Sequence, residues 1–198
     1  MIITDKNKLK IKCEKVKDIR EGEDIAVQLL DHLSNSEIPG IGLAANQIGI
    51  NKRVCVVNVK EPLALINPVV VEKSKEMFAF QEGCLSFPKE YATTRRHVWV
   101  KVKCDNIENE MIFTSEGSTK ENYDNALECA CIQHEIDHLD GVTMFDRELK
   151  SEPIVRGKNA PLKIGRNQKI TIERDGDTKI IKYKKIQPYV DKGWKISV

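Results

Sequence analysis

His134-Glu135-Ile136-Asp137-His138 lies near the end of a segment that predicts a helix. Residues four apart on a helix lie about 40° from each other, so both imidazoles can bind one metal ion. Glu135 lies about 60° to the side of His138, where its carboxylate can exchange a proton with water at the metal. The segment therefore predicts a metal-dependent hydrolase.

The residues that follow do not supply the third ligand of the common zinc peptidases. A His-Glu-x-x-His-x-x-Gly-x-x-His motif would place a histidine at position 144, which is Met144. Thermolysin-like enzymes use a more distant glutamate, but Glu148 and Glu152 lie very close and Glu173 lies in a predicted strand. A metallopeptidase stays open as an alternative, but the usual third metal ligand of that class is missing.

Cysteine offers better third ligands. The chain has six cysteines but no Cys-x-x-Cys zinc knuckle. The polar and basic N-terminus, residues 1–12, lacks the apolar core of a signal peptide, so we expect reduced thiols and no disulfides. Cys131 shares one helical stripe with His134 and His138, whereas Cys84 would come from a different element and close the coordination sphere.

Two further segments combine small residues with polar ones. Residues 81–88 read QEGCLSFP, in which Gly83 lets the backbone approach a ligand and Pro88 forbids a continuing helix. Residues 40–47 read GIGLAANQ, which indicates either tight packing or a loop pressed against a substrate. Each segment alone is a modest signal.

Together, three segments resemble the signature motifs of the peptide deformylase family: GIGLAANQ at 40–47, EGCLS at 82–86 and HEIDHLDG at 134–141. The resemblance covers about residues 2–147. It implies a metal-dependent hydrolase that removes the N-terminal formyl group from formylmethionyl nascent peptides and releases formate. The alternatives are a metallopeptidase or other amidase, or a non-catalytic binding relative.

The resemblance implies that Cys84, His134 and His138 hold the metal. Three protein ligands with a fourth position for water are typical of a catalytic site. One thiolate and two imidazoles suit Fe²⁺, Zn²⁺, Ni²⁺ and Co²⁺, and the resemblance favours Fe²⁺.

The resemblance also assigns the other catalytic groups. Glu135 becomes the general base and later the general acid. The Gln47 side-chain amide and the Leu85 backbone N–H form the oxyanion hole. The pocket for the substrate methionine and its backbone is then lined by Ile41, Gly42, Phe80, Gly83, Leu127, Ala130 and Cys131.

Two arginines precede the predicted strand at 98–103. By the resemblance, Arg96 pairs with Glu82 and stiffens the loop that carries Cys84. The residues alone also allow Arg95 and Arg96 to bind a substrate.

The hydrophobic pattern predicts an α+β domain. Apolar residues at 26, 29, 30 and 33 mark a first amphipathic helix that ends before Pro39. A second helix begins near Asn122 or Asn125, the latter with Glu128 as a capping box, and stops at Gly141. Strand-like runs lie between them at 53–59, 63–71, 98–103 and 111–114. We expect antiparallel β-sheets packed around a central metal-binding helix.

The C-terminus departs from the usual family pattern, in which many bacterial members carry a basic helix. Residues 169–173 and 178–183 alternate in strand fashion around Asp175-Gly176, which predicts a β-hairpin with a type I′ turn. Residues 114–124 also form a longer loop than usual. We divide the chain into a catalytic domain, 1–147, and a basic extension, 148–198, packed on the same domain.

Charge is unevenly distributed between these parts. Residues 148–198 contain 13 lysines and arginines against 6 aspartates and glutamates, whereas residues 1–147 contain 19 against 24. Because the substrate emerges from the ribosome, the basic extension suggests transient contact with ribosomal RNA, and the alternative is a solvated hairpin. We expect neither DNA nor a membrane as partner, since no run approaches 18 apolar residues. The expected location is the cytoplasm of a bacterium or of a virus-infected bacterial cell.

Overall fold

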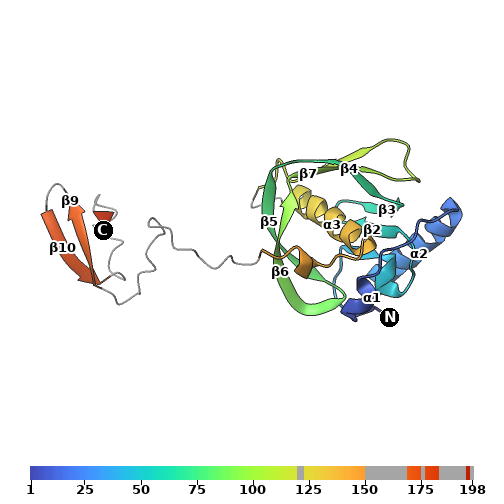
Figure 1. Cartoon of the computed structure of the whole chain (residues 1–198), viewed down its shortest axis with the longest axis horizontal. Helices are drawn as coiled ribbons and strands as arrows, with labels where there is room; N and C mark the ends of the chain where they lie inside the picture. The colour runs from blue at the N-terminus through green and yellow to red at the C-terminus, as the bar shows by residue number, and fades with distance from the viewer. Residues whose placement is uncertain (120–122, 150–168, 175–176, 183–194, 197–198) are drawn as a thin grey trace. The chain divides into compact units, whose positions relative to one another are not determined.

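The computed structural model describes residues 1–119, 123–149, 169–174, 177–182 and 195–196 of the 198. The chain divides into two compact units, an N-terminal unit, Met1–Lys150, and a C-terminal unit, Ser151–Val198 (Figure 1). Whether the extension packs on the catalytic domain stays a prediction. Among the described residues, no helix is both long and apolar enough to cross a membrane.

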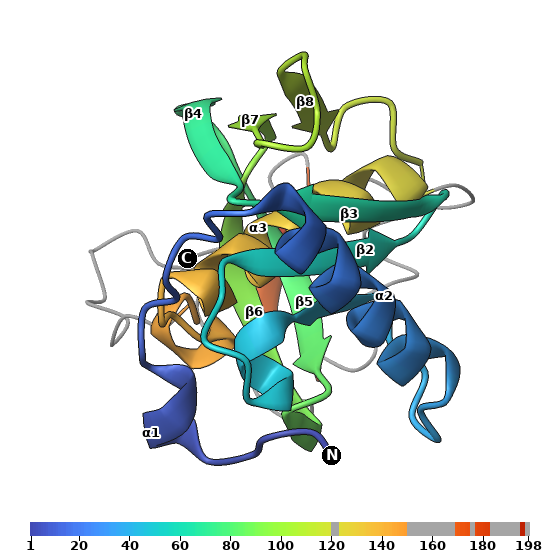
Figure 2. The ribbon, with the colours of Figure 1, turned by 90° about the vertical axis from the view of Figure 1, so that its right-hand side faces the viewer.

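A three-stranded antiparallel sheet lies between two helices in the N-terminal unit. Its strands β1 (Gly42–Ala44), β2 (Val54–Asn58) and β3 (Pro62–Ile66) pair in that order. Figure 2 shows α2 (Ile19–Ser34) on one side of this sheet and α3 (Asp124–Leu139) on the other. The sheet is therefore buried on both faces.

Strand β2 supplies apolar side chains to both faces. Val54 and Val56 belong to the core cluster that contains the buried residues of α2. Cys55 and Val57 belong to the cluster that contains the buried residues of α3. Successive side chains of a strand point to opposite faces, so a continuous apolar run is what a doubly covered strand requires.

Two more antiparallel sheets complete the N-terminal unit. The first contains β4 (Val69–Lys73), β7 (Trp99–Lys103) and β8 (Met111–Thr114), and the second contains β5 (Met77–Cys84) and β6 (Phe87–His97). The unit also contains the short helix α1 (Lys6–Leu9) and the 3₁₀ turns η1 (Ala45–Ile48) and η2 (Met144–Asp146). This arrangement confirms the α+β expectation.

Helix α3 is buried along most of its length, with eleven buried residues between Cys129 and Leu139. It begins at Asp124 after the N-cap Tyr123, which makes no side-chain cap, so the predicted capping box at Asn125 is wrong. It ends as predicted, because Gly141 adopts a φ of 74° and its N–H donates to the His138 carbonyl. Glycine adopts such a left-handed conformation without strain.

The strand predictions were correct at 53–59, 98–103 and 111–114 to within one residue at each end. The run predicted at 63–71 is two strands, β3 and β4, separated at Asn67 and Pro68. Asn67 has a φ of 54° and its side chain bonds the backbone of Val16, so the chain turns there. The β5–β6 hairpin was missed, since the glycine and proline of residues 81–88 indicated a loop.

The C-terminal unit contains the predicted hairpin strands. Strands β9 (Lys169–Arg174) and β10 (Asp177–Lys182) pair as antiparallel neighbours, and β11 (Lys195–Ile196) pairs with the other edge of β9. The predicted turn at Asp175-Gly176 lies outside the described residues, as do residues 120–122 of the predicted long loop.

Candidate active site

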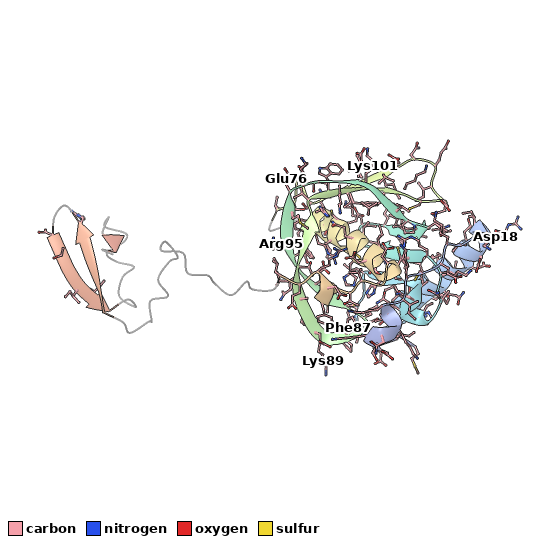
Figure 3. All side chains as sticks on the ribbon, in the orientation of Figure 1. Asp18, Glu76, Phe87, Lys89, Arg95 and Lys101 are labelled. Carbon is pink, nitrogen blue, oxygen red and sulfur yellow. The ribbon has the colours of Figure 1, made fainter. Side chains whose placement is uncertain are left out.

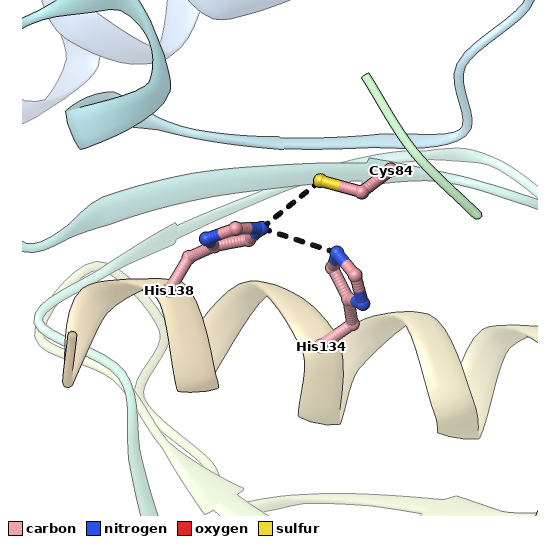
Figure 4. A group of neighbouring side chains, drawn as sticks. All are labelled: Cys84, His134 and His138. Carbon is pink, nitrogen blue, oxygen red and sulfur yellow. Dashed lines mark hydrogen bonds between the residues drawn. The ribbon is translucent and has the colours of Figure 1, made fainter. Parts of the chain in front are cut away.

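Three potential metal ligands converge at the centre of the N-terminal unit. The Nε2 atom of His138 lies 3.1 Å from Nε2 of His134 and 3.3 Å from Sγ of Cys84 (Figure 4). The three ligand atoms all lie within 4.8 Å of one another. A thiol and two imidazole nitrogens in a buried hollow form a donor set that fits a transition-metal ion.

Helix α3 supplies both histidines from one face. Their rings lie 4.8 Å apart between centroids, at an interplanar angle of 72°. Burial lowers the pKa of His138 and so keeps its imidazole neutral, the form that binds a metal. Because Nδ1 of His134 lies 2.9 Å from a carboxylate oxygen of Glu82, its Nε2 is left to face the cluster.

Cys84 reaches the histidines because the β5–β6 pairing changes register beside it. Gly83 pairs with Tyr91, but Cys84 pairs with Phe87, so a tight turn follows immediately. A register shift of this kind re-aims a side chain. The thiol of Cys84 consequently points toward α3 (Figure 4).

A buried network of charged side chains holds Glu82, the carboxylate that contacts His134. Glu82 accepts hydrogen bonds from Nε and Nη2 of Arg96 and from the Thr94 hydroxyl. Arg96 also donates to Asp137, which accepts two further bonds from Arg147. Burial opposes ionisation of Glu82, but the hydrogen bonds from Arg96 and His134 outweigh it and lower its pKa to about 2. Glu82 therefore stays ionised at neutral pH.

The η1 turn fixes Gln47 beside Cys84. The side-chain carbonyl of Gln47 accepts a hydrogen bond from the Ala44 N–H at 2.8 Å, so the side-chain amide nitrogen points the other way. That nitrogen lies 3.1 Å from Oγ of Ser86 and 3.4 Å from Sγ of Cys84. The fully buried amide is thus oriented with its N–H groups toward the candidate metal ligands.

The adjacent Asn46 joins η1 to the end of α3. Its amide nitrogen donates to the His138 carbonyl at 2.7 Å. The last carbonyls of a helix have no partner within the helix, so this hydrogen bond also gives the His138 carbonyl a partner. The 40–47 segment and the helix that carries the candidate histidine ligands are therefore held together directly.

Glu135 is buried beside the two histidines, with 3 % of its surface exposed. Its Oε2 has no hydrogen-bond partner among the described residues. Burial raises the pKa of its carboxyl to about 7. A carboxyl with a pKa near neutrality can both take and give a proton at physiological pH.

A cavity of about 270 Å³ lies in front of these groups. Of the thirteen residues that the sequence singled out, all except the fully buried His138 line it. The twelve are Ile41, Gly42, Gln47, Phe80, Gly83, Cys84, Leu85, Leu127, Ala130, Cys131, His134 and Glu135. We call it the first cavity.

The chain is similar to proteins of one known family. The family model described as polypeptide deformylase matches residues 1–153. A peptide deformylase of Natranaerobius thermophilus is 45% identical over 143 residues, which cover 70% of this chain and 85% of that protein. The chain belongs to the peptide deformylase family.

Solved structures of the family share the fold. The crystal structure of peptide deformylase from Thermotoga maritima has a TM-score of 0.64 and 28% identity, covering 75% of this chain and 96% of that one. A probable peptide deformylase from Synechococcus phage S-SSM7 has a TM-score of 0.61 and 33% identity, covering 74% and 98%. Peptide deformylases are metal-dependent hydrolases that deformylate nascent peptides.

Some residues of this deformylase site were not found from the sequence. The pairing of Arg96 with Glu82 was expected and is confirmed. Asp137 and Arg147 extend the Arg96–Glu82 pair into a network. The sequence did not predict these contacts, because they join a helix to the segment after it. Lys89, Glu90 and Tyr91 also line the first cavity and were missed: they belong to the unpredicted strand β6.

Cys131 lies in the wall of the first cavity rather than in the metal group. The cluster of three ligand atoms consists of Cys84, His134 and His138. The Cys131 thiol lies 3.7 Å from the carbonyl oxygen of Ile41 and is 7% exposed. Of the two cysteines that the sequence left as third ligands, the geometry favours Cys84.

Proposed function

We propose that this chain deformylates formylmethionyl peptides with a metal ion held by Cys84, His134 and His138. When bound, the metal acts as a Lewis acid and lowers the pKa of water to about 7. We further propose Fe²⁺ as the ion in the cell, while Zn²⁺, Ni²⁺ and Co²⁺ suit the same ligands. The convergence of the three ligand atoms beside a buried glutamate carries the proposal.

Glu135 moves the proton in this reaction. Its carboxylate accepts a proton from the water that attacks the formyl carbon, and it later gives that proton to the departing amine nitrogen. A pKa near 7 supports both steps, since the group is then neither a strong acid nor too weak a base. Positioned proton transfer of this kind contributes about 10² to 10⁴ in rate.

Gln47 and Leu85 stabilise the negative charge that develops on the formyl oxygen. The amide nitrogen of Gln47 is held by the bond between its carbonyl and the Ala44 N–H, so it costs little to orient during the reaction. The Leu85 backbone N–H is the second donor. Loss of one such donor costs about 2.7–4 kcal/mol in transition-state stabilisation.

The first cavity selects the methionine side chain and orients the peptide. Its volume of about 270 Å³ and its apolar walls suit a flexible thioether side chain. We assign the walls to Ile41, Phe80, Leu127, Ala130 and Cys131, and the contacts with the peptide backbone to main-chain groups of Ile41, Gly42 and Gly83.

We also propose a transient contact between the basic C-terminal unit and ribosomal RNA. Residues 151–198 contain 12 lysines and arginines against 5 aspartates and glutamates, which attracts phosphate groups. Formylated nascent chains are made in bacteria and in organelles, and the location that we propose is a bacterial cytoplasm, including that of a cell infected by a virus.

The activity test is formate release from a formyl-Met-Ala-Ser peptide by the anaerobically purified chain loaded with Fe²⁺. The Glu135→Gln variant should lose at least about 10²-fold in turnover while elemental analysis still finds one metal per chain. Glu128→Gln is the matched control, because Glu128 lies on the same helix but pairs with Lys60 at the surface. Full turnover in Glu135→Gln would disprove the assigned role.

A further inference from the structure

A second cavity, of about 450 Å³, lies on the other side of α3 from the candidate metal ligands. Gln133, Ile136, Asp137 and Asp140 line it, and they repeat at i, i+3, i+4 and i+7 along one stripe of the helix and its C-cap. The histidines project from a different stripe. Helix α3 therefore separates two cavities, of which deformylation uses only the first.

Part of the wall of the second cavity is aliphatic, although most of the residues that line it are polar or charged. Val70, Val100 and Ile136 are at least partly buried in it, and Val69 and Met77 stand at its mouth, 42% and 45% exposed. Its lining contains no phenylalanine, tyrosine or tryptophan among the described residues. Such walls suit an aliphatic body better than a ring that needs an aromatic partner for stacking.

The charged residues around the second cavity are mostly basic. Seven lysines and arginines line it against two aspartates, whereas residues 1–150 as a whole contain 20 against 25 acidic residues. A cleft lined by one sign of charge concentrates the field and attracts ligands of opposite sign. The basic residues are Lys12, Lys15, Arg53, Lys73, Arg95, Arg96 and Arg147.

Some of these cations are neutralised within the fold and others are not. Arg53 pairs with Asp140, and Arg96 and Arg147 pair with Asp137. Lys73 and Arg95 are exposed and have no acidic partner within the described part of the chain. Figure 3 shows Arg95 on the outside of β6. These two side chains can therefore reach a bound anion without breaking an internal ion pair.

We propose that the second cavity binds an amphipathic anion, a phosphate or carboxylate attached to a short aliphatic body. The aliphatic walls take the body, and Lys73 and Arg95 at the rim take the charged group. A volume of about 450 Å³ is in the usual range of small-molecule sites. This ligand is separate from the peptide substrate, which occupies the first cavity.

The binding test uses the full metal-loaded chain and three probes in calorimetry: octyl phosphate below its micelle concentration, inorganic phosphate and octanol. We expect octyl phosphate to bind one-to-one and at least about tenfold more tightly than either fragment. Burying two methylene groups contributes that factor over inorganic phosphate, and charge-assisted hydrogen bonds to the phosphate contribute a similar factor over octanol. Equal affinity for inorganic phosphate, or no saturable binding of octyl phosphate, would overturn the proposal. These measurements need no variant.

Charge reversal then locates the site. The Lys73→Glu/Arg95→Glu variant should bind octyl phosphate at least about tenfold more weakly. The matched control is Lys8→Glu/Arg20→Glu, which changes the net charge equally at exposed positions outside the lining and should bind like the wild type. If both variants bound octyl phosphate equally weakly, the loss would be due to net charge alone, and the placement of the anion at Lys73 and Arg95 would be wrong.

A third variant and an activity measurement guard against misfolding. Met77→Glu places a carboxylate at the mouth on a half-exposed side chain, and it should also weaken octyl phosphate binding. All variants should deformylate formyl-Met-Ala-Ser at the wild-type rate, which shows that they are folded. Wild-type affinity in Met77→Glu and in Lys73→Glu/Arg95→Glu together would refute the site.

The same chemistry can come from a free metabolite or from a lipid head group, and vesicles distinguish the two sources. Cosedimentation with phosphatidylglycerol vesicles that is lost in Lys73→Glu/Arg95→Glu would assign the anion to a lipid. Binding of free octyl phosphate without cosedimentation would assign it to a soluble amphiphile.

Discussion

At the scale of single residues, the first cavity depends on how closely the backbone at Gly42 approaches α3. A Cβ at this position would collide with Oε1 of Glu135 and with Sγ of Cys131. Only glycine lets the 40–47 segment lie against the carboxylate that we assign as the proton carrier. The residue therefore bears on the geometry of catalysis although its own side chain has no chemistry.

Gly42→Ala should lower kcat/KM by about 10²-fold with the metal retained, because the added methyl displaces Glu135 from the metal ligands. Steady-state kinetics and metal analysis check this. Gly83→Ala is the comparison: its Cβ would meet only the exposed ring of Tyr91 at 3.3 Å, which can move. A smaller loss in Gly42→Ala than in Gly83→Ala would contradict the steric argument.

Cys84 should be the one rapidly reacting thiol of the metal-free native chain. It is half-buried, whereas burial raises the pKa of Cys13 to about 11 and of Cys104 to about 12 and keeps these thiols protonated. The thiolate is the reactive form. Titration with a disulfide reagent at pH 8 should find one fast thiol, and six in denaturant. Added metal should suppress the fast reaction, and a fast thiol that persists in Cys84→Ser would refute the assignment.

At the scale of elements, the segment that follows α3 is held against both α1 and β6. The Arg95 N–H donates to the Arg147 carbonyl and the Leu149 N–H to the Thr93 carbonyl, so residues 147–149 lie along β6. The η2 turn precedes this contact and is closed by Asp146, which accepts from the N–H and hydroxyl of Thr143. The turn thus helps to set Arg147 against Asp137.

Asp146→Ala should destabilise the chain by about 1 kcal/mol at pH 7, the usual contribution of a capping side chain. Burial opposes ionisation, but the bonds from Thr143 and Lys10 outweigh it and lower the pKa of Asp146. A lowered pKa means that the stabilisation is present above the ordinary value of 3.8 and is lost as the pH falls below it. The difference between variant and wild type should therefore shrink between pH 5 and pH 3, a range of about two units around that value.

Urea unfolding of the wild type and of Asp146→Ala at pH 5 and at pH 3 measures this difference in the free energy of unfolding. Lys10→Met is the control for the ion pair alone, whose side chains are 53% and 39% exposed and which should contribute less than about 1 kcal/mol. If the stability difference between Asp146→Ala and the wild type grew on acidification, the predicted direction of the pH dependence would be wrong.

At the scale of the whole molecule, the N-terminal unit contains the candidate site, and the family match ends at residue 153. The residues of the candidate site all precede Lys150. The net positive charge, by contrast, lies in residues 151–198, where lysines and arginines outnumber aspartates and glutamates by 12 to 5.

A chain that ends at Pro153 should retain the deformylase turnover of the full chain on a formyl-Met-Ala-Ser peptide, because it keeps every residue matched by the family model. It should lose cosedimentation with ribosomes, and the full chain should lose it at high salt, where phosphate contacts are screened. Cosedimentation that survives the truncation would rule out docking through the C-terminal unit.

The features that depend on local spacing could be predicted from the amino-acid sequence. The i, i+4 histidines predict their common face on α3, Gly141 predicts the end of that helix, and the alternation in 169–183 predicts two paired strands. The motifs around Gln47 and Cys84 also identified the family. These features need only the neighbours of each residue along the chain.

How distant segments meet became known from the folded structure alone. The register shift at Cys84 turns its thiol toward α3, and the contacts from Glu82 through Arg96 to Asp137 and Arg147 join β5, β6, α3 and the segment after it. The second cavity likewise exists only because two sheets and the far stripe of α3 diverge around it. Such contacts follow from strand register and from long-range packing, which local periodicity does not encode.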